Sequence, residues 1–512
     1  MSQQSKTKQT WPILLFTIGV FMAGLDNGII GTALTTINES YGVSPDWGAW
    51  SITIYTLGIA MSVPIIGKFS DRYGRRRLFI IEITLFGIGS LLVALSPNFA
   101  FLLFSRFIQA IGGGGIFIIG SSHILATLPQ KEQGKALGLL GSMHGLSAII
   151  GPNLGAVILS LTGNWQWMFF INIPIAILLI IFGFLKIPES RAGLTKPLDV
   201  RGIILLTVGI LAMMFGLTNL DHAQFLTSLI DTRVIIFILI GWISLIWLIS
   251  HERQLESFNG DPIISYRMLA RGNFQLILFL GLLSGGFISS IMFVPSYVQQ
   301  VLLIPVEKAG FWVTPLALAS GIGAGFGGFL TDKFGAVRTV VLSGFIAIVG
   351  FLLFPYWVND LTTFVIASII GGIGFGFLLG APLNVLAGEQ AKERDKGSAL
   401  GMLSLARQIG LVVFPTLFAG FITKGFSQVK QAVNYVADDV ITVDMTVTDT
   451  SQDAYLSIIQ QIETLPDREL QTRLLETIAQ VLKTGYDQMF LVAGILALFV
   501  IIAGGQLFKS KD

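Results

Sequence analysis

Fourteen apolar stretches of about 20 residues run through the sequence, and they restrict the fold more than any other feature. An α-helix rises about 1.5 Å per residue, so each stretch can cross a hydrocarbon layer about 30 Å thick. Within that layer the backbone has to satisfy its own hydrogen bonds, which favours helices. The sequence therefore predicts an all-α integral membrane protein. The expected spans are 12–34, 47–68, 78–96, 99–127, 136–161, 167–187, 201–218, 232–250, 272–298, 309–330, 338–356, 362–386, 398–423 and 486–508.

The composition excludes several other classes of protein. Of the 512 residues, 53% are hydrophobic and only 12% are charged, whereas a soluble domain carries about 25% charged residues. The formal charge of +2 is small and the basic residues are scattered, which argues against a nucleic-acid partner. The chain has no cysteine, so disulfides, zinc fingers and thiol catalysis are excluded.

The distribution of basic residues predicts the orientation in the membrane. Lysine and arginine gather in the even-numbered connections, such as 68–77, 131–135 and 392–396, while the short odd-numbered connections hold almost none. By the positive-inside rule, the even-numbered connections and both termini are expected to be cytoplasmic. The first apolar run is too long for a signal peptide and contains Asp26, so we interpret it as the retained first helix of a multi-pass protein of the cell membrane.

One predicted outer connection, 424–485, is much longer than an ordinary loop and is acidic. Part of it, 470–482, has leucine and isoleucine at helical spacing, and another part, 441–447, alternates apolar and polar residues as a strand does. We expect a small external cap or hairpin here, which is also the candidate contact for a partner.

The two ends of the chain contain a repeat. The segment Gly67–Gly74 reappears as Gly328–Gly335 at an offset of 261 residues, and Pro152 corresponds to Pro415 at an offset of 263. The offset covers eight spans, an even number, so the two copies have the same orientation and place a substrate site at their interface near the midplane. The predicted domains are a six-helix bundle at 1–190, two inserted helices with their linkers at 191–271, and a second six-helix bundle at 272–512 that includes the outer segment 424–485.

The connection after the second span holds a dense group of charges and glycines. Its members are Gly67, Asp71, Arg72, Gly74, Arg75 and Arg76. Charges so close have to pair, and the glycines permit a tight turn. We expect these ion pairs to form a latch that holds the cytoplasmic ends of the two bundles together, with Glu82 joining it and Asp332 in the equivalent place of the second half. A plain topological anchor would explain the arginines but not Asp71 or the glycines.

This connection is very similar to the loop signature of the major facilitator superfamily. The fifth span resembles the antiporter signature of proton-driven exporters, and the residues that carry this likeness are Gly141, Gly145, Gly151, Pro152 and Gly155. The same glycines would also suit ordinary close helix packing. The first span around Asp26 and the stretch Trp165–Pro174 are similar to the fourteen-helix drug:proton antiporter branch. The resemblance implies a major facilitator fold and export of hydrophobic or cationic drugs by alternating access, without enzymatic activity.

Two charges inside the spans are the candidates for proton coupling. Asp26 lies roughly 21 Å from the cytoplasmic end of the first span, and Arg106 roughly 10 Å from the outer end of the fourth, so their depths coincide in a layer about 30 Å thick. A buried carboxylate beside a mobile cation can bind and release a proton, because burial and pairing act on its acidity in opposite directions. A static buried ion pair is the alternative interpretation.

The candidate substrate contacts come from the repeat. His144 of the fifth span corresponds to Arg407 of the thirteenth, so one polar residue from each half is expected to face the shared cavity. Gln109 and Asn153 are further candidates. Hydrogen bonds between packed helices are the alternative role for all four.

The sequence has no phosphate-binding loop, no His-Glu-x-x-His motif and no nucleophile with a base, so we expect no ATP-driven pumping, no metal and no cofactor. A proton gradient is the expected energy source, with a small-molecule substrate, protons and the lipid bilayer as partners. Three other functions remain open: export of a lipid or an endogenous metabolite, uptake of a nutrient, and a non-transporting sensor or scaffold.

Overall fold

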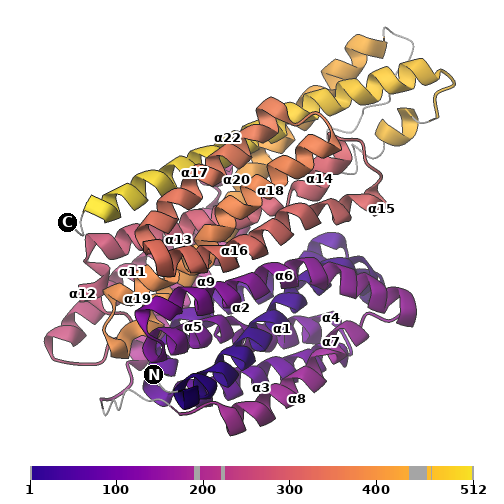
Figure 1. Ribbon diagram of the computed structural model, residues 1–512. Helices are drawn as coiled ribbons and strands as arrows, with labels where there is room; N and C mark the ends of the chain where they lie inside the picture. Colours follow the sequence, from indigo (N-terminus) through magenta and orange to yellow (C-terminus); the bar gives the residue numbers. More distant parts are fainter. Residues whose placement is uncertain (1–2, 190–195, 221–224, 438–457, 463, 510–512) are drawn as a thin grey trace.

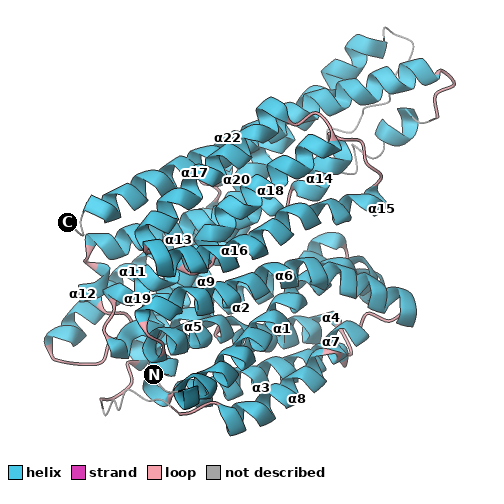
Figure 2. Ribbon diagram, in the orientation of Figure 1, coloured by secondary structure: helices cyan, strands magenta, loops and turns pink. Residues whose placement is uncertain are grey.

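The computed structural model describes residues 3–189, 196–220, 225–437, 458–462 and 464–509, and every regular element in these ranges is a helix (Figure 2). Fourteen of the helical segments are long and apolar enough to cross a membrane, which confirms the predicted number. The chain is therefore a multi-pass membrane protein.

The first bundle consists of six spans, two of which are divided by a short break. Its helices are α1 (Gln3–Tyr41), α2 (Pro45–Tyr73), α3 (Arg75–Ala94), α4 (Phe99–Gly114) with α5 (Ile116–Thr127), α6 (Gln130–Thr162), and α7 (Trp167–Phe170) with α8 (Asn172–Lys186). The inserted spans are α9 (Val200–Thr218) and α11 (Thr232–Ser257), accompanied by the short helices α10 (Phe225–Ser228) and α12 (Tyr266–Leu269).

The second bundle repeats the first with six further spans. Its helices are α13 (Gly272–Ile291) with α14 (Val294–Gln300), α15 (Val306–Ala309) and η1 (Gly310–Val313) leading into α16 (Thr314–Phe334), α17 (Ala336–Trp357), α18 (Leu361–Leu379) with α19 (Pro382–Gln390), η2 (Glu393–Asp395) leading into α20 (Lys396–Ala437), and α22 (Arg468–Lys509).

The two bundles lie side by side, and both termini are at the same end of the molecule (Figure 1). That end also carries the basic connections 68–77, 131–135 and 392–396, and we call it the basic end. The inserted helices α9 and α11 pack on the outside of the seam, where Leu206 and Ile210 of α9 join one apolar cluster with Leu57 of α2 and Leu405 of α20. The inserted pair therefore contacts both bundles.

The break between α4 and α5 lies next to Glu82. The N–H of Gly115 donates to Oε2 of Glu82 at 3.0 Å, and a Cβ added to Gly115 would lie 2.6 Å from that oxygen. Glu82 is fully buried at this position on α3. The expectation that Glu82 joins the loop latch is therefore wrong, because its carboxylate accepts a hydrogen bond from the backbone at the start of α5 instead.

At the basic end the bundles touch backbone to backbone through glycines. A Cβ added to Gly328 of α16 would lie 2.2 Å from the carbonyl oxygen of Gly134 of α6, and one added to Gly67 of α2 would lie 2.3 Å from the carbonyl oxygen of Gly397. Real side chains do not approach so closely, so these two crossings need residues without a Cβ. The basic end is closed.

The bundles separate toward the opposite end. The glycine contacts of α6 with α16 reach as far as Gly145, which faces Gly321, whereas Gly151 and Gly155 face α1 instead. Beyond Gly145, Ile150 of α6 is 40% exposed. Figure 1 shows α6 and α16 diverging toward the end where α15 lies. The two bundles are therefore in closest contact at the basic end and lie further apart at the opposite end.

The predicted external element is helical. Helices α20 and α22 each have 42 residues, about twice the length that a membrane span needs. Their outer ends project together from the bundle (Figure 1) and share an apolar cluster that includes Val433, Leu474 and Ile478. The helix expected over 470–482 is confirmed as part of α22, while the strand expected over 441–447 lies outside the described residues.

The crossing of α6 and α16 generates a first prediction. Gly328→Ala introduces a methyl group into a backbone contact, and such overpacking costs about 1–3 kcal/mol, enough to shift a two-state equilibrium roughly tenfold. Because the native chain has no cysteine, a single cysteine introduced as Ser398→Cys reports on opening of the basic end. Its maleimide labelling is expected to become about tenfold faster in Gly328→Ala.

The matched control is Gly505→Ala, because nothing lies within 4 Å of a Cβ built at Gly505. Labelling should be unchanged in this control. An unchanged labelling rate in Gly328→Ala would mean that the glycine crossing does not hold the basic end closed.

Candidate functional site

A cluster of polar side chains is fully buried inside the first bundle. Nη1 of Arg106 on α4 donates to Oδ2 of Asp26 on α1 at 2.5 Å. Neither side chain has more than 1% of its surface exposed. The structure therefore brings together the two intramembrane charges that depth alone had matched.

Two amides complete the shell around the Asp26 carboxylate. Nε2 of Gln109 donates to Oδ1 of Asp26 at 2.8 Å, and Nδ2 of Asn172 on α8 lies 3.5 Å from the same oxygen. Both amides also donate to Oγ of Ser90 on α3, at 2.8 and 3.3 Å. Four helices thus contribute to one network, and all of its members are sealed from solvent.

The guanidinium of Arg106 is held by weaker partners on its other sides. Its Nε donates to the carbonyl oxygen of Ser51 at 3.4 Å, and its central carbon lies 4.1 Å from the centre of the Tyr55 ring. The second terminal nitrogen, Nη2, is buried and has no hydrogen-bond partner among the described residues. Arg106 therefore depends on Asp26 for charge compensation.

Small residues let the helices approach closely enough to build this network. A Cβ added to Gly89 of α3 would lie 2.6 Å from the backbone of Gln109, so α3 and α4 are in backbone contact where Ser90 meets Gln109. A Cβ added to Gly24 of α1 would lie 2.0 Å from Oγ of Ser147 on α6. Because no side chain separates these helices at the two glycines, the polar side chains of the network can reach one another.

The expected role of Gln109 has to be corrected. It was predicted to contact substrate in the cavity between the halves, but it is fully buried in the Asp26 network. Its position one helical turn after Arg106 is the signal that would have placed it there. Ser90 and Tyr55 were missed, since an isolated serine or tyrosine in an apolar span carries no such signal.

The loop at the basic end joins the two bundles through Asp71. Its Oδ2 accepts hydrogen bonds from the backbone N–H groups of Gly397 at 2.7 Å and Ser398 at 3.3 Å, at the start of α20, and its Oδ1 pairs with Arg75 at 3.3 Å. A carboxylate at a helix N-terminus is favoured by the helix dipole. The contact that Asp71 makes between the bundles is therefore carboxylate to backbone, and the ion pair between this region and the second bundle is the long one of Lys68 with Asp395, at 4.0 Å.

The second copy of the loop makes the mirrored contact. Oδ1 and Oδ2 of Asp332, near the end of α16, accept hydrogen bonds from the N–H groups of Gly134 at 2.6 Å and Lys135 at 2.9 Å on α6. Gly74 and Gly335 follow the two aspartates with φ of 101° and 90°, a region that favours glycine. Each bundle thus contributes one aspartate that accepts hydrogen bonds from the backbone of the other bundle.

The remaining arginines of the loop have other partners. Arg72 pairs with Asp261 of the connection after α11 at 3.1 Å, and Lys68 pairs with the same carboxylate at 2.5 Å. Arg76 lies 3.7 Å from Glu189, after α8. The loop therefore also binds the inserted helices, which the sequence pattern did not indicate.

The glycines of the fifth span face two different neighbours. Gly141 and Gly145 lie against Gly380 and Gly321 of the second bundle. Gly151, Pro152 and Gly155 lie against α1, where a Cβ on Gly28 would be 2.7 Å from the ring of Pro152. Helix α6 is therefore in close contact both with the opposite bundle and with the helix that carries Asp26.

The other cavity candidates differ in exposure. His144 on α6 is exposed and Arg407 on α20 is half-buried. Nε of Arg407 donates to Oγ of Ser284 at 3.1 Å. Asn153 is exposed and donates to the carbonyl oxygen of Ile149 within its own helix at 2.7 Å.

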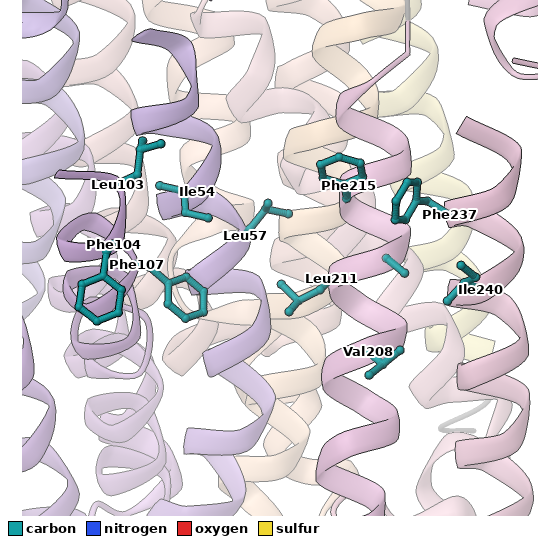
Figure 3. Close-up of a pocket in the computed structure, with 11 residues that line it drawn as sticks. Ile54, Leu57, Leu103, Phe104, Phe107, Val208, Leu211, Phe215, Phe237 and Ile240 are labelled. Carbon is teal, nitrogen blue, oxygen red and sulfur yellow. The ribbon is translucent and has the colours of Figure 1, made fainter. Parts of the chain in front are cut away.

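A separate pocket of about 680 Å³ lies between α2, α4 and the inserted helices (Figure 3). Its walls are apolar side chains, among them Phe104 and Phe107 of α4, Phe215 of α9 and Phe237 of α11. None of the described residues that line it has a polar side chain that could orient a charged ligand.

Two repeated helical bundles that close at one end around glycines define a membrane transporter. The family model of the Major Facilitator Superfamily matches residues 16–415, and the chain belongs to this superfamily.

Several known proteins are similar to the chain. It is 55% identical over 498 residues to the MFS-type transporter YfiU of Bacillus subtilis, covering 97% of this chain and 96% of YfiU. It is 32% identical over 433 residues to Multidrug resistance protein 3 of Bacillus subtilis, covering 83% and 81%. The solved structure of the proton:xylose symporter XylE covers 97% of this chain and 96% of its own, with a TM-score of 0.59 at 15% identity, a likeness of fold.

The buried ion pair generates a second prediction. Removing one partner leaves an uncompensated buried charge and costs about 3–5 kcal/mol. Asp26→Asn and Arg106→Gln should therefore each lower the free energy of unfolding in detergent, and the double variant should lose less than the sum of the two. The exposed pair Arg473–Glu469 is the control, because Arg473→Gln should cost less than about 1 kcal/mol. Additive losses in the double variant would contradict a coupled pair.

Proposed function

We propose that the protein is a proton-coupled antiporter that exports hydrophobic, drug-like compounds. The observation that carries this proposal is the buried ion pair between Asp26 of α1 and Arg106 of α4, inside the first bundle. Charges inside a membrane are costly and usually have a function. The likeness to Multidrug resistance protein 3, at 32% identity, supports the drug-like class of substrate.

Proton exchange follows from the isolation of Asp26. In the arrangement described, the carboxylate is fully buried and holds the charge of Arg106. Protonation of Asp26 would leave the guanidinium with only neutral partners, namely Gln109, the Ser51 carbonyl and the Tyr55 ring. The neutral state of Asp26 thus disfavours this conformation, so proton binding and the rearrangement of the bundles are linked.

The direction of transport in this proposal rests on the likeness to Multidrug resistance protein 3. The basic end is assigned to the cytoplasm, together with both termini, because lysine and arginine gather there. With its bundles in contact at that end, the conformation described corresponds to an outward-facing state, in which an exporter releases its substrate. A return through the cytoplasm-open state requires the contacts of Asp71 and Asp332 to break.

Export of a lipid is the second candidate. The apolar pocket beside α2 and α4 has room for acyl chains, and its walls lie in membrane-spanning helices (Figure 3). A lipid substrate would require this pocket for transport, whereas a drug exporter would tolerate a bulky side chain such as Leu211→Trp in it.

The third prediction tests proton coupling in everted membrane vesicles whose lumen has been acidified. Native vesicles are expected to accumulate a fluorescent drug-like dye and to release luminal protons as they do so. Asp26→Asn is expected to lose at least about 90% of gradient-driven uptake, since loss of a proton-carrying group typically costs 10²-fold or more. Asp26→Glu should retain part of it.

The matched control is Asp487→Asn, which removes another carboxylate within a span, one paired with Lys483 at 3.1 Å. It should transport normally. Exchange of labelled for unlabelled dye, without a gradient, shows whether Asp26→Asn is folded. Undiminished gradient-driven uptake by Asp26→Asn would exclude Asp26 as the coupling acid.

A further inference from the structure

His144 and Arg407 occupy equivalent places in the two bundles. His144 on α6 lies beside Gly24 of α1, where an added Cβ would be 3.7 Å from Nδ1 of the imidazole. Arg407 on α20 lies beside Gly285 of α13, where an added Cβ would be 2.2 Å from the Arg407 carbonyl oxygen. Gly24 and Gly285 are 261 residues apart, and His144 and Arg407 are 263 residues apart. These are the offsets of the sequence repeat.

Both side chains face the space between the bundles. Helix α6 lies between α1 and α16, yet His144 is exposed. The positive charge of Arg407, which comes from the other bundle, acts on the imidazole of His144. The exposure of His144 is therefore exposure to the shared interior, at about the depth of Gly24 and Asp26.

Arg407 has no counter-ion among the described residues. Its Nε donates to the neutral hydroxyl of Ser284, and its Nη2 has no hydrogen-bond partner in the part of the chain that the structure describes. No acidic side chain there acts on it electrostatically. A half-buried, uncompensated guanidinium is costly, and it binds an anion with charge-assisted hydrogen bonds when one arrives.

Five carboxylates of the two bundles already have other roles. Asp26 and Glu82 are fully buried, and Asp26 is already neutralised by Arg106. Asp71 and Asp332 hold the basic end closed. Asp487 pairs with Lys483. None of these five is left to meet a cation, whereas Arg407 keeps a positive charge with no acidic partner among the described residues.

We propose that the space between the bundles binds an amphipathic organic anion, whose carboxylate, sulfonate or phosphate group is held by Arg407 with His144 on the facing helix. Arg407 presents a planar guanidinium suited to such groups. A cationic drug would be repelled there, so the anionic class replaces the cationic one suggested by the resemblance. This inference rests on the proposed export of small molecules, and it narrows their charge.

The test compares two xanthene dyes of similar size and opposite charge, fluorescein as the anion and rhodamine 123 as the cation. Binding to the purified full-length protein is measured by fluorescence polarisation. The native protein is expected to bind fluorescein at least about tenfold more tightly than rhodamine 123, and Arg407→Gln to lose about tenfold for fluorescein alone. Arg407→Lys, which keeps the charge, should retain most of the affinity.

A second measurement needs no variant. Raising the salt concentration should weaken the binding of fluorescein to the native protein more than that of rhodamine 123. Screening reduces the attraction of the anion to the positive site, and it also reduces the repulsion of the cation. Neither measurement uses a proton gradient. A failure of coupled export in vesicles would therefore not affect the anion proposal, and a failure of anion binding would not exclude coupled export. Tighter binding of rhodamine 123, no binding of fluorescein, or equal losses of both dyes in Arg407→Gln would overturn the proposal.

Discussion

The ion pair between Asp26 and Arg106 is the interaction on which the other features depend. Two opposite charges at a fully buried position stabilise each other only while both are present and both are ionised. The surrounding amides and the Tyr55 ring satisfy the remaining contacts of the pair but cannot replace its charge. A change in the protonation of Asp26 therefore alters the free energy of the whole first bundle, by an amount comparable to a conformational equilibrium, about 3–5 kcal/mol.

The close packing of α6 connects this pair to the seam between the bundles. Helix α6 touches α1 near Asp26 through Gly151 and Pro152, and it touches α16 through Gly134 and Gly145. A movement of α1 against α6 should therefore also change the contact of α6 with α16. Helices that touch backbone to backbone are close-packed, so one cannot move without displacing the other. At the basic end of this contact, Asp332 of α16 binds the backbone at the start of α6, and Asp71 of α2 makes the equivalent contact with the start of α20.

Sequence reasoning predicted the large features well, because they depend on apolar length and on repeated motifs. The fourteen spans were predicted, as was the helix over 470–482, and the repeat pointed to Asp332 as the equivalent of Asp71 in the second half. The contact of the loop with α20 could not be predicted in detail, since the donors to Asp71 are the backbone N–H groups of Gly397 and Ser398, and almost every residue has such a group. Glu82 and Gln109 were misplaced because the direction of a side chain around a helix depends on which neighbours pack against it.

The inserted helices show the same limit. Nothing in the charge pattern indicated that Asp261 would bind both Lys68 and Arg72, because Asp261 is distant in sequence from these two residues and belongs to neither repeat. Their contact makes the connection after α11 part of the closed basic end. The family of the chain does not by itself supply this detail, which comes from the geometry alone.

Proton release on substrate binding tests the central role of Asp26 most directly. Purified protein in a weakly buffered detergent solution is mixed with a saturating transported dye, and the proton release is followed with a pH indicator. If Asp26 exchanges its proton for substrate, the native protein releases about one proton per molecule bound, and Asp26→Asn binds dye but releases none. Equal proton release from native protein and Asp26→Asn would contradict the account, because the exchanged proton would then come from another group.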